Sequence, residues 1–232
     1  MRKILKLKFI AIFLLLTVFL FSCGSKKETT VRFGRYKQTI NQEMKDIEWI
    51  VLQEDADKKL LLSKEILDCL EYDDTGDDCT WETCSLRAWL NYDFYEEVFN
   101  EEEKSKILTT TVVNEANDLY EFVIDGGADT NDKVFLLSIN EVRKYFGEGE
   151  KIQSGYKIGD KITAKATDYA KLADEDGNVI VTEDENSFYW LRSPGHYPNT
   201  ASVVDSKGNL LAFGYNVDYA VIGVRPVIWI SK

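Results

Sequence analysis

The stretch SFYWLRSPGHYPN, Ser187 to Asn199, carries an aromatic run and an arginine directly into Pro-Gly. Successive side chains alternate along an extended strand, so Trp190 and Arg192 share one face and their neighbours share the other. Pro194 and Gly195 end the strand and start a loop whose tip is polar and aromatic. The sequence therefore predicts a strand that acts as scaffold, followed by an exposed loop.

Similar segments follow this stretch and also open the domain. They are short β-rich runs separated by Pro, Gly and Asn, and SKGN, Ser206–Asn209, is typical of a hairpin turn. The predicted strands are Val31–Gln38, Ile47–Gln53, Leu60–Leu62, Lys133–Leu137, Ser187–Ser193, Ala201–Ser206, Asn209–Gly214 and Gly223–Ile230.

Helical patterns lie between these two groups of strands. Apolar residues from Leu86 to Val98 recur at three- and four-residue intervals, which indicates one helical stripe facing the core. Ser138 and Glu141 form a capping-box pattern at the start of another helix. Shorter helices are predicted over Ser63–Leu70, Glu101–Leu108 and Thr163–Ala173. Helices in the middle and strands at the ends predict an α+β domain, an antiparallel sheet with helices packed against it.

The first residues have the build of an export signal. MRKILKLK is basic, and a short apolar run, Phe9 to Phe21, follows it. The run ends in LFSC, which resembles the bacterial lipobox, and that resemblance implies that Cys23 is lipidated and becomes the first mature residue. We expect a signal peptide over 1–22, a tether over 23–30 and a single domain over 31–232. The alternative is a helix that anchors the chain through the apolar run.

Charge narrows the possible partners. Residues 1–22 hold four of the 28 basic residues and no acidic one, so the mature chain has 24 basic against 40 acidic residues, a net charge of −16. Such a surface repels phosphate backbones, which argues against a nucleic-acid partner.

Three cysteines remain beyond Cys23: Cys69, Cys79 and Cys84. An exported chain can keep disulfides, and three cysteines allow at most one bridge within the chain. We expect Cys69–Cys84, because it closes a loop of fourteen residues. The alternative is three free thiols. The sequence has no CxxC pattern, which argues against zinc.

No convincing catalytic, metal or cofactor set is present in the sequence. Asp174–Glu185 has the acidic spacing of a calcium loop, but its glycine is at position 4 and Val179 takes position 6. His196 is the sole histidine, and no GxSxG elbow accompanies it. Ser193 precedes a proline and no motif supports it as a nucleophile. We therefore expect no metal and no cofactor, and catalysis is not favoured.

Two arginines lie inside otherwise apolar strands. Arg192 is in YWLRSPG, and Arg225, followed by Pro226, is in GVRPVIW. A charge at such a position must be paired or hydrogen-bonded to be tolerated. The sequence favours a scaffold role for both arginines over contact with a ligand.

Several motifs together carry a family resemblance. They are FGRYKQ followed by IEWIVL, LLLSKEILDC, TWETCSLRAWLNYDFY, DKVFLLSINEVRKYF, YWLRSPG and GVRPVIWI. From about residue 33 to 230 the chain resembles an uncharacterised bacterial family, a domain of unknown function with WLRSPG and GVRP motifs that is common in exported proteins. This resemblance implies no particular activity and no catalytic residues.

The closing strands are also similar to the end of formylglycine-generating-enzyme-like domains. Those domains have the C-type-lectin-like fold, so the resemblance implies a C-type-lectin-like domain that displays ligand-binding loops. It does not imply their chemistry, because this sequence has no cysteine after Cys84 and lacks the lectins' calcium motifs.

A binding module is the leading functional hypothesis. The candidate binding residues are Tyr197, Asn199 and Asn216, since function tends to lie on loops held by rigid elements. We expect a bacterial lipoprotein that is exported and tethered by its lipid to the membrane or cell surface, with a glycan or a protein as ligand. The alternatives are an enzyme of unrecognised type acting on envelope polysaccharide and a structural component of the envelope.

Overall fold

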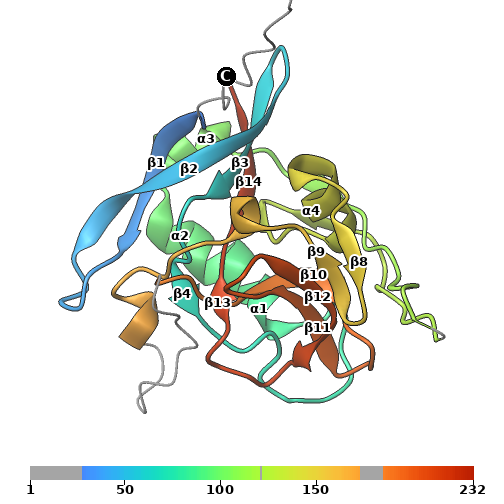
Figure 1. Cartoon of the computed structure of the whole chain (residues 1–232). Coiled ribbons are helices and arrows are strands. Elements are labelled where there is room, and N and C mark those ends of the chain that lie inside the picture. Colours follow the sequence, from blue (N-terminus) through green and yellow to red (C-terminus); the bar gives the residue numbers. More distant parts are fainter. Residues whose placement is uncertain (1–27, 121, 173–184) are drawn as a thin grey trace, which may run out of the picture.

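The computed structural model describes residues 28–120, 122–172 and 185–232, and the described chain is mostly β. A five-stranded sheet occupies the upper part of Figure 1, and every pairing in it is antiparallel. Its strands, in spatial order, are β1 (Thr30–Lys37), β2 (Met44–Glu54), β3 (Lys58–Ser63), β14 (Val227–Ser231) and β7 (Val134–Phe135).

A seven-stranded sheet occupies the lower part of the same view (Figure 1). In it β13 runs parallel to β10, and the other pairings are antiparallel. Its strands, in spatial order, are β4 (Asp68–Cys69), β13 (Gly223–Val224), β10 (Tyr189–Pro194), β11 (Thr200–Val204), β12 (Asn209–Asn216), β9 (Gly155–Lys157) and β8 (Glu150–Ile152).

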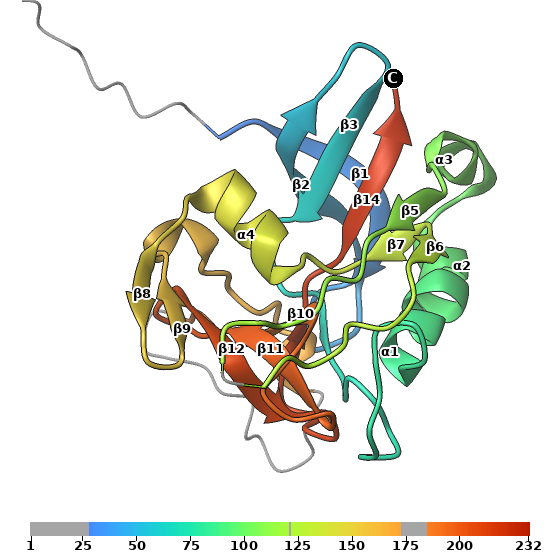
Figure 2. The ribbon, with the colours of Figure 1, turned by 90° about the vertical axis from the view of Figure 1, so that its right-hand side faces the viewer.

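The remaining elements are short. Two strands, β5 (Thr110–Val112) and β6 (Thr130–Asp132), form a third sheet. The described helices are α1 (Ser85–Trp89), a π-helical turn (Leu90–Phe94), α2 (Tyr95–Val98), α3 (Glu101–Lys106), α4 (Ile139–Phe146) and two 3-10 turns (Asp160–Ile162 and Ala170–Leu172). Figure 2 shows α4 at the side of the two large sheets and α1, α2 and α3 on the opposite side.

The chain crosses between the two large sheets at Arg225 and Pro226. β13 belongs to the seven-stranded sheet and β14 to the five-stranded sheet, so GVRPVIWI, predicted as one closing strand, forms two strands. Proline cannot donate a hydrogen bond to a strand partner. Its carbonyl instead accepts from the backbone N–H of Ser63 at 2.9 Å. One short segment therefore connects both sheets.

The predicted fold class is wrong. The described chain has three sheets and helices of at most 8 residues, and these do not form a layer packed on one antiparallel sheet. The C-type-lectin-like fold that the closing strands imply is not seen either. The physical reason is the split at Arg225 and Pro226, which sends the last strand into a second sheet instead of closing the first.

The predicted helix Ser63–Leu70 is also wrong, and of the predicted helix Thr163–Ala173 the structure shows only the 3-10 turn Ala170–Leu172, because the backbones of the two segments pair with each other. Ile66 and Ala166 form a parallel bridge, the N–H of Ile66 donates to the carbonyl of Lys165 at 2.9 Å, and the N–H of Thr167 donates to that of Ile66 at 3.0 Å. Ile66 and Ala166 are buried. Burial between distant segments outweighs the local helical preference.

Other local predictions are confirmed. The stripe from Leu86 to Val98 lies on the run from α1 to α2, and Leu86, Leu90, Phe94 and Val98 are buried. The capping box at α4 is complete: the hydroxyl of Ser138 accepts from the N–H of Glu141 at 3.1 Å, and the Glu141 carboxylate accepts from the N–H of Ser138 at 2.9 Å. The SKGN turn joins β11 to β12 as predicted.

Candidate functional site

The loop after β10 is a tight turn held by its own backbone. The N–H of Gly195 donates to the carbonyl of Thr200 at 2.8 Å, and the N–H of Thr200 donates to that of Tyr197 at 3.0 Å. The N–H of His196 donates to the carbonyl of Phe213 on β12 at 2.8 Å. A Cβ on Gly195 would lie 2.2 Å from the Thr200 hydroxyl and 2.6 Å from the Phe213 carbonyl, so only glycine fits. The turn is thereby fixed against β12.

This turn carries a cluster of four rings, which we call the aromatic surface: Tyr120, His196, Tyr197 and Phe213. The ring of His196 stacks on Phe213 with centroids 5.0 Å apart, and it lies 4.6 Å from Tyr120 and 4.8 Å from Tyr197. Tyr197 is 52% exposed and Phe213 is 43% exposed. Four rings in contact, half of them open to solvent, form an apolar platform at the end of the seven-stranded sheet.

Two polar atoms inside the aromatic surface lack partners. Nδ1 of His196 and the hydroxyl of Tyr120 are buried and have no hydrogen-bond partner among the described residues. Burial also raises the pKa of Tyr120. Buried polar atoms without partners are uncommon and call for an explanation. They give the apolar platform two groups that can hydrogen-bond a ligand or a water.

Asn117 joins the parts of the aromatic surface that come from distant loops. Its side-chain amide donates to the carbonyls of Pro194 and Gly195 at 3.0 Å each and to that of Ala212 at 2.8 Å. Its own oxygen accepts from the N–H of Leu119 at 3.2 Å. Asn117 is buried, so it holds the loop bearing Tyr120 against the turn bearing His196.

The predicted binding residues lie at this end of the sheet. Tyr197 belongs to the aromatic surface. Asn216 is exposed and pairs with Thr200 across β11 and β12, and the carbonyl of Asn199 accepts from the N–H of Val217 at 3.1 Å. Sequence reasoning missed Tyr120, Phe213 and Asn117. Side chains alternate along β12, so the burial of Ala212 places its neighbour Phe213 on the exposed face. No such pattern indicates the position of Tyr120 or the contacts of Asn117, because both lie in a loop.

A groove of about 430 Å³ lies next to the aromatic surface. Pro198 lines it together with Cys79, Val123 and two acids, Asp78 and Asp125. The N–H of Cys79 donates to the carbonyl of Pro198 at 3.1 Å, so the acidic loop before α1 packs directly against the turn. The surroundings of the aromatic surface are therefore acidic and do not favour an anionic ligand.

His196 is not placed for hydrolysis. A triad needs a nucleophile and an orienting acid at the imidazole. The described contacts of His196 are with the rings of Tyr120, Tyr197 and Phe213. The Ser193 hydroxyl is not among these contacts. It accepts a hydrogen bond from the N–H of Ile139 at 3.0 Å. This arrangement suits binding and supplies no nucleophile.

Arg192 and the residues around it have the geometry of scaffold. Arg192 is 4% exposed and donates to the carbonyls of Leu136 at 2.7 Å and Val113 at 3.1 Å, and also to the carboxylate of Glu141. Trp190 is buried, and its indole N–H donates to the carbonyl of Leu70 at 2.9 Å. These bonds connect β10 to the segment before α4 and to the segment after β4.

Arg225 is buried at the crossing between the sheets. It is 2% exposed, and its Nε donates to the carbonyl of Ser63 at 2.9 Å. Its Nη1 donates to the carbonyl of Ile162 at 3.1 Å and to the Tyr189 hydroxyl at 3.2 Å. The guanidinium therefore satisfies acceptors from three separate segments. We predict that Arg225 stabilises the folded domain.

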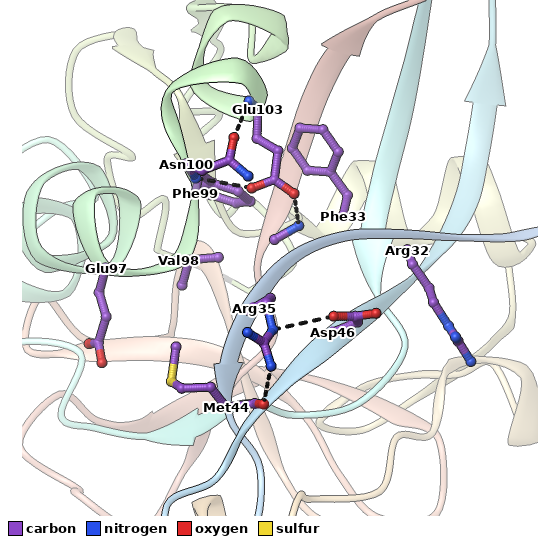
Figure 3. Close-up of a pocket in the computed structure, with 11 residues that line it drawn as sticks. Arg32, Phe33, Arg35, Met44, Asp46, Glu97, Val98, Phe99, Asn100 and Glu103 are labelled. Atoms are coloured by element: carbon purple, nitrogen blue, oxygen red, sulfur yellow. Dashed lines mark hydrogen bonds and ion pairs between the residues drawn. The ribbon is translucent and has the colours of Figure 1, made fainter.

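A second groove, of about 420 Å³, lies between the β1–β2 hairpin and the segment from α2 to α3. Figure 3 shows Arg35 bonded within the groove: it contacts Asp46 at 3.4 Å and donates to the carbonyl of Met44 at 2.7 Å. Glu103 accepts from the N–H of Gly34 at 2.8 Å. Gly34 has φ +68°, and a Cβ there would lie 2.7 Å from Phe99. These contacts hold the β1–β2 hairpin against the helical segment, so we assign the groove a structural role and no ligand.

The predicted Cys69–Cys84 disulfide is absent, because Cys69, Cys79 and Cys84 are free thiols. Cys69 lies in β4 and pairs with Gly223, whereas the thiol of Cys84 faces the carbonyl of Trp81 at 3.5 Å. Cys69 is therefore fixed in the seven-stranded sheet, whereas Cys84 lies at the start of α1. Burial raises the pKa of Cys69 and of Cys79 to about 12, so neither thiol is a ready nucleophile.

Among the described residues no group of three or more His, Cys, Asp or Glu side chains could hold a metal ion. The calcium-loop pattern, Asp174–Glu185, lies outside the described residues except for Glu185. Cys23 also lies outside them.

Comparison with known proteins identifies the family. The model of a family described as a domain of unknown function, DUF6273, matches residues 56–232, and the chain belongs to this family. The match begins after β2, later than the resemblance at about residue 33 suggested. No curated protein and no solved structure matched the chain significantly.

Proposed function

We propose that this member of the DUF6273 family is an exported binding module, tethered through an acylated Cys23, that binds a glycan on the aromatic surface. The observation that carries the proposal is the cluster of Tyr120, His196, Tyr197 and Phe213, with two rings exposed and two polar atoms that have no partner among the described residues. Exposed apolar patches on a folded domain mark interaction sites.

A sugar ring fits this combination of groups. One face of a pyranose presents C–H groups that pack on an exposed ring such as Tyr197 or Phe213, and its hydroxyls need hydrogen-bond partners. Nδ1 of His196 and the hydroxyl of Tyr120 are buried polar atoms that can supply them after a small rearrangement. The tight turn and Asn117 hold the platform in place, which lowers the entropy cost of binding.

Charge favours a neutral glycan over an anionic one. The mature chain carries 24 − 40 = −16 charges, and Asp78 and Asp125 line the groove beside the aromatic surface. A polyanionic polymer would be repelled from such a surface. The proposed ligand is therefore an uncharged saccharide of the cell envelope or its surroundings.

Loss of either exposed ring is expected to weaken binding without unfolding the domain. A glycan array probed with the purified chain identifies the saccharide, and calorimetry with Tyr197→Ala and Phe213→Ala measures the loss. We expect each variant to bind at least about tenfold more weakly, the order of one lost contact of about 1.4 kcal/mol, with an unchanged melting temperature. Asn199→Ala is expected to weaken binding less.

Tyr92→Ala is the matched control, because Tyr92 is 72% exposed on the helical run far from the turn. Full affinity in Tyr197→Ala and Phe213→Ala together would refute the glycan site. If the array is blank but a protein partner is lost in the same two variants, the surface stands and the ligand class changes to protein.

Acylation of Cys23 is the expected basis of the tether. No helix of the described residues is long and apolar enough to cross a membrane. In this proposal the lipid on Cys23 is the anchor, and the six residues from Gly24 to Thr29 link it to β1. Metabolic labelling with a palmitate analogue is expected to mark the wild type and not Cys23→Ala. Undiminished label in Cys23→Ala would contradict the proposal, and Cys79→Ala serves as the control.

A further inference from the structure

A cavity of about 360 Å³ lies away from the aromatic surface, between α4 and the strands β14 and β5. Its walls include the rings of Tyr145 on α4, Trp229 on β14 and Phe135 on β7. This volume is in the range of small-molecule sites, which combine apolar walls with a few convergent polar groups. The polar groups decide which ligand the cavity suits.

Arg192 lines this cavity with its hydrogen-bonding capacity only partly used. Its side chain is 3% exposed. A guanidinium has five N–H groups. The bonds to Leu136, Glu141 and Val113 account for three of them, and Nε is buried with no partner among the described residues. Buried donors without acceptors are costly, so the site favours an additional acceptor.

Lys144 adds a second cation to the cavity wall. Its ammonium lies 4.8 Å from the centroid of the Tyr145 ring and donates to the Tyr145 hydroxyl at 3.2 Å. No carboxylate of the described residues lies within ion-pair distance of it. Its charge is therefore available to a ligand.

The two acids of the cavity are hydrogen-bonded to other groups of its wall. Glu141 accepts from the N–H of Ser138 at 2.9 Å and also from Arg192. Glu115 accepts from the side-chain amide of Asn140 at 2.6 Å. Glu141 thus offsets the charge of Arg192. The donors left on the wall among the described residues are the Nε of Arg192 and the ammonium of Lys144, beside aromatic rings.

We propose that this cavity binds a small organic acid, whose carboxylate meets Lys144 and Arg192 and whose apolar body packs on Tyr145 and Trp229. Charge-assisted hydrogen bonds from a lysine and an arginine are among the strongest that side chains can offer a carboxylate. This site is separate from the glycan surface and stands without it.

The test uses matched small probes and the full-length chain in a neutral detergent. Benzoate supplies a ring and a carboxylate, benzamide supplies the ring without the charge, and acetate supplies the charge without the ring. Saturation-transfer NMR measures the binding of each probe at concentrations up to about 10 mM, which detects even weak dissociation constants. We expect benzoate to bind at least about tenfold more tightly than benzamide or acetate.

Variants place the binding in this cavity. Lys144→Met is expected to weaken benzoate about tenfold and to leave the melting temperature unchanged. Lys151→Met, on the exposed strand β8, and Tyr197→Ala, on the aromatic surface, are expected to bind benzoate as the wild type does. The proposal is overturned if benzoate does not bind by about 10 mM, if benzamide binds equally well, or if Lys144→Met leaves binding intact.

Discussion

Replacing Arg225 by alanine is expected to lower the free energy of unfolding by about 3 kcal/mol, the order of the cost of leaving buried acceptors without their donor. Arg225 is 2% exposed and bonds the carbonyls of Ser63 and Ile162 and the hydroxyl of Tyr189. Without the guanidinium these acceptors stay buried with fewer partners. For a domain of this size the melting temperature is expected to fall by roughly 6–12 °C, measured by calorimetry.

Arg192→Ala is expected to behave in the same direction, since Arg192 is equally enclosed. The control is Arg32→Ala, because Arg32 is exposed and its pair with Glu48 spans 3.6 Å at the surface, where ion pairs contribute little. If both Arg192→Ala and Arg225→Ala melt within about one degree of the wild type, the scaffold role is wrong.

Asp132→Ala is expected to cost about 4 kcal/mol, since it breaks a buried ion pair and leaves the other charge behind. The side chain of Asp132 is fully buried. It accepts from the indole N–H of Trp81 at 2.8 Å and from the Thr130 hydroxyl at 2.7 Å. Arg87 approaches it with Nε and Nη2, both at 2.7 Å. One carboxylate thus ties β6 to α1 and to the loop before it.

Urea unfolding measures this effect. Asp132→Asn, which keeps the shape and loses the charge, is expected to fall between the wild type and alanine. Asp93→Ala, at an exposed position of the same helical run, is expected to be near neutral. An unfolding free energy for Asp132→Ala within about 1 kcal/mol of the wild type would show that this network is not a main support of the fold.

The sequence was informative wherever structure is set by neighbours along the chain. The capping box of Ser138 and Glu141 and the stripe from Leu86 to Val98 were predicted because both depend on spacing within one helix. Strands were found for the same reason. Their grouping into sheets was not, because the position of β14 beside β3 and β7 is a contact between residues far apart in sequence.

The errors have the same origin. Ser63–Leu70 has a local helical preference, but Ile66 gains more from a buried bridge to Ala166. Part of the candidate site was predicted from the sequence: Tyr197 lies on the turn that Pro194 and Gly195 indicate. Tyr120 reaches the rings of His196 and Phe213 from a distant loop, and that loop is held there by Asn117, which bonds carbonyls of the turn 77 and 78 residues away. No local pattern encodes such a contact.

The central claim is that ligand binds at the aromatic surface, and the sole histidine gives it a direct test. His196 is at the centre of the surface, so the imidazole signals in an NMR spectrum of the labelled chain report on this site without ambiguity. On titration with the glycan identified by the array, the account predicts saturable shifts of the His196 ring signals with the affinity measured by calorimetry. A glycan that saturates the protein while those signals stay unmoved would contradict it.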